Sequence, residues 1–231
     1  MKNVGGQVQI AALLSFNGGF IDTIGFLGLH GLFAAHITGN FVTLGAALVL
    51  GTHGIIGKLL AVPEFILVIG LARLAGTALR ARQVPVLRVM LVVTALLVLA
   101  FFLLAVCYGP FQNPDGPIAL LTGFTAVAAM AVQNGMQRVH LGHLPTTTIM
   151  TGNSTQFALD AVDLLFGQRA ARTPEMRQRF HRLSVAMITF IAGCAAAAWL
   201  YWLFGFWSLA LPALVAAVAA VMRTEGVPPR E

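Results

Sequence analysis

Long apolar runs separated by short polar loops dominate the chain. A helix needs about 20 apolar residues to cross a hydrocarbon core of about 30 Å. Six continuous runs have roughly this length and lie at residues 7–29, 55–79, 86–108, 117–139, 183–204 and 207–223. Two further runs, 32–51 and 144–166, carry glycine and polar residues at their centres and do not form uninterrupted spans. The pattern predicts an all-α integral membrane protein.

Both interrupted runs contain the tripeptide Thr-Gly-Asn. Its two copies consist of Thr38, Gly39, Asn40, Thr151, Gly152 and Asn153. A helix that begins inside a membrane leaves its first N–H groups unpaired and presents about half a unit of positive charge. Thr and Asn side chains can cap such a start, and Gly lets the backbone approach a ligand. We predict two half-helix starts that bind an anion at the membrane midplane; alternatively, the triplets only cap two short helices packed together.

Arginines in the loops predict the orientation of the chain. Arg80, Arg82 and Arg88 flank one loop and five more arginines lie between residues 169 and 182, whereas loop 107–116 has no Lys or Arg. By the positive-inside tendency, the two basic loops face the cytoplasm and the third faces outward. One strong run and one Thr-Gly-Asn run connect the outward loop to the second basic loop. Because these two loops lie on opposite sides, the chain between them must cross an odd number of times. The simplest solution is that the strong run crosses and the Thr-Gly-Asn run enters the membrane and returns.

This orientation predicts two inverted repeats within one membrane domain. Residues 1–112 and 113–231 each supply three transmembrane helices and one broken or re-entrant Thr-Gly-Asn half-helix. Both termini are then cytoplasmic, in agreement with Lys2 and Arg230 near the two ends. Eight full spans would instead make the repeats parallel and place the first basic loop outside.

Charged and amide side chains inside the apolar runs extend the predicted site. Asp22 and Arg138 lie within or near the ends of two runs, and a charge at the bilayer centre costs roughly 3 kcal/mol. Aligning Gly19 with Gly135 places them opposite each other, with a three-residue gap. We predict that Arg138 holds an anionic group and that Asp22 carries a coupling proton or neutralises Arg138. The alternative is a structural ion pair between them, and Asn134 can supply neutral donors.

Composition agrees with a membrane location. Hydrophobic residues make up 58% of the 231 residues and charged residues 10%, and the mean hydropathy is +0.85. The net charge of +6 lies mainly in loops beside apolar runs, so nucleic acid is excluded as a partner. The expected partners are the lipid bilayer and a small solute, and a homodimer stays an option.

Catalysis and metal binding have no support in the sequence. No Ser-His-Asp set, phosphate loop or dinucleotide motif is present. The two histidines of HLGH, residues 140–143, have no Cys, Glu or Asp nearby to complete a metal site. Cys107 and Cys194 lack metal-ligand spacing. We expect no enzyme activity, no metal and no cofactor.

The chain resembles the YoaK-type bacterial inner-membrane proteins in two stretches, GGFIDTIGFLGLHGLFAAHITGNFVTLG and QNGMQRVHLGHLPTTTIMTGN. The resemblance covers nearly the whole chain and implies a multi-pass protein of the bacterial inner membrane, without an activity or a functional residue to carry over. A looser similarity is to the core domain of sulfate and nucleobase transporters, in which short strands lead into half-helices that meet at a substrate. The chain is too short to include the gate domain of those transporters.

The sequence therefore predicts a membrane transporter or channel for a small anionic or carboxylate-bearing solute. The solute would bind at the midplane between the two Thr-Gly-Asn helix starts, with Arg138 nearby. A non-transporting membrane scaffold with a dry, side-chain-filled centre is the alternative from another class. The amide side chains also fit a neutral polar solute such as a nucleobase.

Overall fold

The computed structural model describes residues 4–166 and 173–222, which form helices and contain no strand. The helices are α1 (Val4–Gly28), α2 (Ile37–Leu50), α3 (Ile55–Ala81), α4 (Val86–Tyr108), α5 (Pro117–His140), α6 (Met150–Phe166), α7 (Pro174–Phe204), η2 (Gly205–Leu209) and α8 (Ala210–Val221). This confirms the predicted all-α fold.

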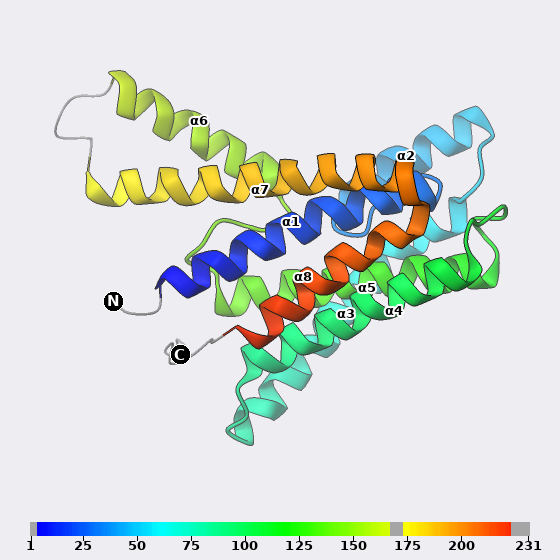
Figure 1. Ribbon diagram of the computed structural model, residues 1–231, viewed down its shortest axis with the longest axis horizontal. Helices are drawn as coiled ribbons and strands as arrows, with labels where there is room; N and C mark the ends of the chain where they lie inside the picture. The colour runs from blue at the N-terminus through cyan, green and yellow to red at the C-terminus, as the bar shows by residue number, and fades with distance from the viewer. Residues whose placement is uncertain (1–3, 167–172, 223–231) are drawn as a thin grey trace.

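Five helical segments among the described residues are long and apolar enough to cross a membrane. They are Gly5–Gly28, Ile55–Ala81, Val86–Tyr108, Pro117–His140 and Pro174–Val221. The last segment reverses its direction at Gly205, which has a φ of 54° and follows the end of α7. Figure 1 shows that α7 and α8 run in opposite directions. The helices that carry Thr-Gly-Asn are shorter, with 14 residues in α2 and 17 in α6.

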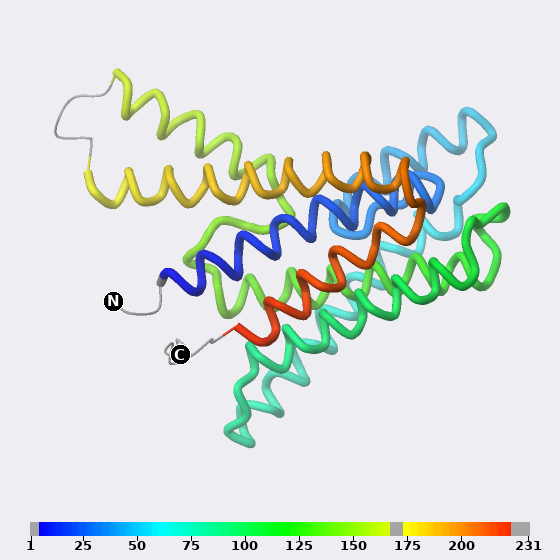
Figure 2. Tube along the Cα trace, in the orientation of Figure 1, coloured from blue at the N-terminus to red at the C-terminus, as the bar shows by residue number. Residues whose placement is uncertain are grey.

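The course of the chain between the two ends of the molecule can be followed in Figure 2. α1 runs from left to right, and the chain then turns back, so that α2 begins near the middle and returns to the right end. α3, α4 and α5 run left, right and left again. After α5 the chain turns back once more, and α6 begins near the middle and returns to the left end. α2 and α6 thus return to opposite ends.

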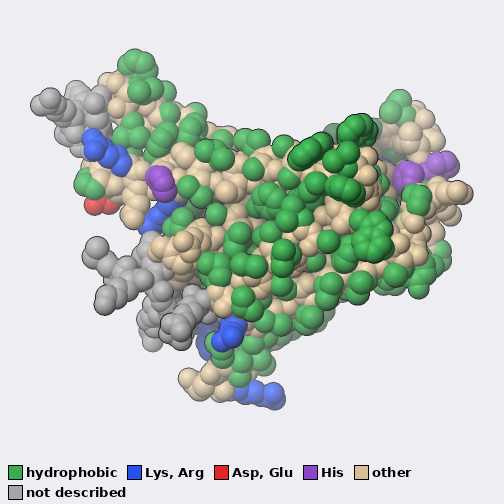
Figure 3. Space-filling view, viewed as in Figure 1, with side chains coloured by type: hydrophobic (Ala, Val, Ile, Leu, Met, Phe, Trp, Pro, Cys, Tyr) green, Lys and Arg blue, Asp and Glu red, His purple; other side chains and the backbone are tan. Residues whose placement is uncertain are grey.

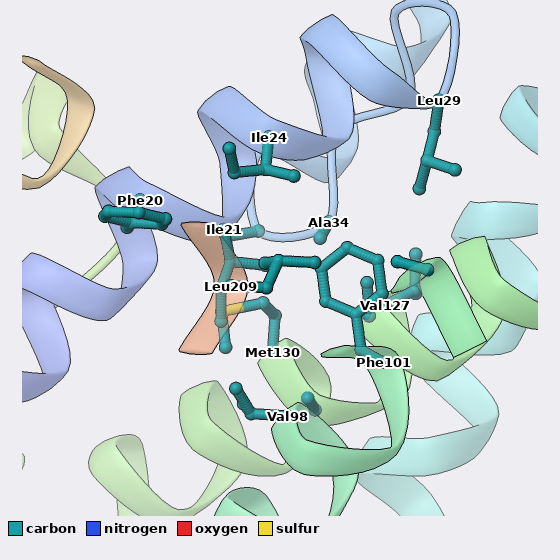
Figure 4. Close-up of a cluster of buried hydrophobic side chains, with 14 of the residues drawn as sticks. Phe20, Ile21, Ile24, Leu29, Ala34, Val98, Phe101, Val127, Met130 and Leu209 are labelled. Carbon is teal, nitrogen blue, oxygen red and sulfur yellow. The ribbon is translucent and has the colours of Figure 1, made fainter. Parts of the chain in front are cut away.

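The main core joins helices from both halves of the sequence (Figure 4). Its labelled side chains come from α1, α4, α5 and η2 and from the residues between α1 and α2: Phe20, Ile21, Ile24, Leu29, Ala34, Val98, Phe101, Val127, Met130 and Leu209. This cluster holds α1 against the α4–α5 pair and fixes the segment that leads into α2.

α1 and α7 pack with their backbones in close contact because glycines lie at the crossing. A Cβ atom at Gly19 would lie 2.3 Å from the carbonyl oxygen of Phe190, and one at Gly193 would lie 2.2 Å from that of Phe16. Small residues allow such an approach between membrane helices. The α1–α7 contact therefore has no room for a side chain at either glycine.

Positive charge gathers at one side of the molecule. Figure 3 shows Lys and Arg side chains mainly at the left and lower-left ends. The α3–α4 connection and the start of α7 lie at these ends, whereas the α4–α5 connection lies at the right end. This separation is the one that the positive-inside interpretation requires. The side of the membrane that each end faces stays a prediction.

Candidate functional site

Both Thr-Gly-Asn triplets lie in the first turn of a helix, and their Asn side chains make matching contacts. Asn40 donates to the carbonyl oxygen of Phe33 and accepts from its backbone N–H, both at 2.8 Å. Asn153 donates to the carbonyl oxygen of Thr146 at 2.7 Å and accepts from its hydroxyl at 3.2 Å. Each Asn therefore holds the residue seven positions before it and fixes the segment that leads into its helix.

The Thr and Asn side chains of the first triplet do not cap the start of α2 as we expected. The N-cap residue of α2 is His36, which makes no side-chain capping bond, and the amide of Asn40 is used by Phe33 instead. A Cβ atom at Gly39 would lie 2.9 Å from the ring of Phe33, so this glycine permits the same close approach. For Asn40, Gly39 and Asn153 the contacts favour packing. The other three triplet residues are exposed on the protein surface: Thr38, Thr151 and Gly152.

The start of α2 is occupied by a carboxylate of the protein itself. Asp22 of α1 is 3% exposed and accepts hydrogen bonds from the backbone N–H groups of Ala35 (2.6 Å) and His36 (3.2 Å). It also pairs with Nδ1 of His36. These N–H groups and the positive end of the helix dipole would otherwise attract an anion. Asp22 thus takes the position that we predicted for a solute at the first triplet.

An ion pair between Asp22 and Arg138 is not found among the described residues, where the ion pairs are His36–Asp22 and Arg179–Asp160. Asn134 in α5 makes a contact with the same sequence spacing as that of Asp22. Asp22 contacts His36 fourteen positions later, and Oδ1 of Asn134 accepts from the hydroxyl of Thr148 fourteen positions later, at 2.5 Å. Asp22 and Asn134 are thus similar, because each side chain holds a segment that leads into a shorter helix. Asn134 lies one helical turn before Arg138, which was the predicted partner of Asp22.

A cavity of about 420 Å³ lies between α3, α5 and the segment that leads into α6. Its volume is within the range of about 300–1,000 Å³ that is typical of small-molecule sites. Two predicted site residues, Arg138 and Asn134, line it, whereas Asp22 and the two triplets do not. The remaining polar side chains of the wall are Arg73, Arg80, Gln137, His140 and Thr146. We therefore take the α3–α5 cavity, rather than the space between the triplets, as the candidate site.

Three arginines line this cavity, and we call Arg73, Arg80 and Arg138 the cavity arginines. No Asp or Glu is among the lining residues. Within the described part of the chain, the cavity arginines take part in neither of the two ion pairs. A guanidinium group offers five N–H donors that fit a carboxylate or phosphate. The arrangement can bind an anion.

Two of the cavity arginines, Arg73 and Arg80, lie outside the site that the sequence predicts, because arginines near the ends of apolar runs indicate orientation first. The sequence nevertheless carries a periodic signal. Residues three, four or seven positions apart share one face of a helix, and this spacing relates Ile69, Arg73, Gly76 and Arg80 in α3. All four residues line the cavity. Arginines on the same face as apolar residues were thus the available indication of the site.

A second ion pair joins α6 to α7 outside the cavity. Asp160 is fully buried and accepts from Nε and Nη2 of Arg179 at 2.8 and 2.6 Å. The hydrogen-bonded guanidinium group holds the pKa of Asp160 below its usual range. Since its partner is already present, Asp160 is a structural residue. In the ranges 4–166 and 173–222, no three His, Cys, Asp or Glu side chains come together as a metal site would require.

These features define a class of protein: a multi-pass helical membrane protein with an arginine-lined cavity between two of its helices. A family model described as "Protein of unknown function (DUF1275)" matches residues 10–222. The chain belongs to this family. No curated protein and no solved structure matches it.

Proposed function

We propose that the protein transports a small anionic solute across the membrane and binds it in the α3–α5 cavity. The observation that carries this proposal is the set of cavity arginines without a carboxylate in the wall. Charged side chains in membrane segments are costly, and they commonly pair with one another or mark a solute pathway. A carboxylate or phosphate would supply the missing negative charge. A neutral solute such as a nucleobase would leave the guanidinium groups without an anion.

The proposed solute contacts one Thr-Gly-Asn region rather than two. Asp22 fills the start of α2, whereas Thr146 and Ile149, which precede α6, line the cavity together with Asn134. The first N–H groups of α6 would add a partial positive charge close to the cavity arginines. Asn134 donates one N–H of its amide to the carbonyl oxygen of Met130, and its second N–H would orient the bound anion. Arg138 and Asn134 thus keep the roles that the sequence suggested, at a different position.

We also propose that residues 1–112 and 113–231 are inverted repeats that allow alternating access. The opposite return of α2 and α6 (Figure 2) and the matching contacts of Asn40 and Asn153 support this. Packing differs between the corresponding helix pairs. Backbones touch where α1 crosses α7, while α3 and α5 leave an open cavity between them. If the α1–α7 pair opened while the α3–α5 pair closed, the solute would be exposed first to one side of the membrane and then to the other.

The proposed orientation predicts a labelling pattern in a variant that lacks Cys107 and Cys194. A cysteine replacing the exposed Gln112, in the α4–α5 connection, is expected to react with an impermeant maleimide added to intact cells. A cysteine replacing the exposed Ala81, at the end of α3, is expected to react only after the membrane is opened. The reverse pattern would contradict the cytoplasmic location of both termini. Fractionation with inner-membrane markers tests the location that the YoaK-type resemblance implies.

Transport itself is tested with purified protein in liposomes and labelled monocarboxylates or phosphate outside. Uptake of the transported anion is expected to fall about 10- to 100-fold in Arg138→Gln, because hydrogen bonds to charged groups contribute about 1.5–3 kcal/mol. The matched control is Arg88→Gln, which removes an exposed arginine outside the cavity wall. Its uptake is expected to equal that of the unmodified protein.

Two outcomes of this flux measurement would count against the proposal in different ways. Equal uptake by folded Arg138→Gln and by the unmodified protein would remove the cavity as the binding site. Absence of uptake for every anion would favour the non-transporting scaffold, in which the Asn40 and Asn153 contacts serve packing alone.

A further inference from the structure

We infer that the ligand of the α3–α5 cavity is an amphipathic anion, with its anionic group on the cavity arginines and an apolar chain between α3 and α5. This inference rests on the proposed function and names the chemical class of its solute. The inference follows from the apolar part of the cavity wall, because an anionic group on the arginines would leave that part without contact to the ligand.

The remainder of the wall is mainly apolar. Its apolar residues include Phe65 and Ile69 from α3, Met90 from α4, Gly135 and Val139 from α5, and Ile149 from the segment before α6. A cavity of about 420 Å³ is larger than a bare two-carbon anion fills. Burial of apolar surface on both ligand and wall is favourable. A ligand with a hydrocarbon part therefore uses surface that acetate or phosphate leaves uncovered.

The α3 part of the wall has an apolar end. Phe65 and Ile69 precede both Arg73 and Arg80 in α3, and Phe65 lies eight residues before Arg73, which corresponds to about 12 Å along a helix. The cavity arginines share the remainder of the wall with apolar residues such as Val86 and Val139. An amphipathic anion would lie with its charged group on the arginines and its chain toward Phe65.

This ligand chemistry has two sources. One is a free carboxylate with a hydrocarbon chain, and the other is an anionic phospholipid that enters from the bilayer. Basic pockets between membrane helices on the cytoplasmic side are known to bind lipid head groups. Both sources place an anion on the arginines and hydrocarbon against the apolar wall, so the test must separate them.

A chain-length series tests the inference on the unmodified protein in nanodiscs of phosphatidylcholine. Isothermal titration with acetate, butyrate, hexanoate and octanoate is expected to show affinity rising about fourfold for each added CH₂ until the cavity is filled. Octanol, which has the chain without the charge, is expected to bind at least about tenfold more weakly than octanoate. Arg138→Gln is expected to lower octanoate affinity about tenfold or more, and Arg88→Gln is expected to leave it unchanged.

Two glycine variants test where the chain lies. A Cβ atom at Gly135 would meet Ile69 at 3.8 Å, an ordinary contact, so Gly135→Leu adds bulk to the apolar part of the cavity. Gly70 is exposed and its Cβ would meet nothing within 4 Å, so Gly70→Leu is the matched control. Gly135→Leu is expected to lower octanoate affinity about tenfold and to lower acetate affinity by a smaller factor. If Gly135→Leu does not fold, the chain-length series decides alone.

Native mass spectrometry after exchange into phosphatidylglycerol nanodiscs identifies the source. A phospholipid occupant predicts one phosphatidylglycerol retained by the unmodified protein and lost in Arg138→Gln, with weaker octanoate binding in these nanodiscs. A free solute predicts equal octanoate affinity in both lipids.

Equal affinity for acetate and octanoate would overturn the inference and leave transport of small anions standing. Failure of every probe to bind, together with no retained lipid, would also overturn the inference, and the flux measurement in liposomes would then decide on transport separately. Absence of flux for all anions in liposomes, with octanoate still bound, would overturn the proposed function and leave the amphipathic site.

Discussion

Gly193→Ala is expected to destabilise the protein by about 3 kcal/mol or more, at the upper end of the cost of overpacking. The added Cβ would lie 2.2 Å from the carbonyl oxygen of Phe16, a backbone atom that no side-chain rotation can move. α1 and α7 would have to separate, which would loosen the contact at Gly19 as well. Thermal unfolding in detergent, followed by size-exclusion chromatography, measures the effect.

Gly70→Ala provides the matched control for this substitution. It makes the same chemical change in another membrane helix, where a Cβ would meet nothing within 4 Å. Alanine has the higher helix propensity, so its thermal midpoint is expected to stay the same or to rise. Equal midpoints for Gly193→Ala and Gly70→Ala would contradict the close contact between α1 and α7.

Asp22→Leu is expected to release the start of α2 and to cost about 2–6 kcal/mol. The reason is that the backbone N–H groups of Ala35 and His36 lose their acceptor, and each unsatisfied buried group costs about 1–3 kcal/mol. Asp22→Asn keeps one acceptor oxygen and is expected to cost less. Hydrogen exchange of residues 33–40, together with thermal unfolding, measures the change.

Asp22→Asn also separates this structural role from the coupling-proton role that the sequence suggested. A structural Asp22 predicts that uptake in liposomes falls only as far as the folded fraction falls. Loss of uptake in a variant with unchanged stability and unchanged hydrogen exchange would favour the coupling proton. Unchanged exchange of residues 33–40 in Asp22→Leu would contradict the role of this carboxylate at α2.

The apolar runs predicted the bounds of a helix closely where the whole helix is apolar. Helix α4 has the predicted bounds 86–108, and α3 and α5 end within two residues of the predicted runs. α7 differs, because it begins at Pro174, nine residues before the predicted run at 183. Its first turns are polar, so hydropathy gave no signal there. The local signals were Thr173, whose hydroxyl accepts from the N–H of Met176, and proline at the first position.

Two of the residues that the sequence singled out line the candidate cavity. Arg138 and Asn134 do line a cavity, and this could be anticipated because polar groups in apolar segments need partners or a cavity. Arg73 and Arg80 could not be separated from orientation signals by composition alone. Whether an arginine lines a cavity or only faces the membrane surface depends on the neighbouring helix, which here is α5.

The sequence by itself determined the membrane class, the placement of the apolar helices and the two helix starts at Thr-Gly-Asn. These properties depend on residues that are near one another in the chain, because both hydropathy and helix initiation are local. Tertiary structure decided which groups fill those starts and where a cavity remains. Asp22 occupies the start of α2 because α1 and the following segment fold back together. α1 and α7 leave no space between them, because their backbones touch at Gly19 and Gly193. α3 and α5 do leave space, and the cavity lies between them.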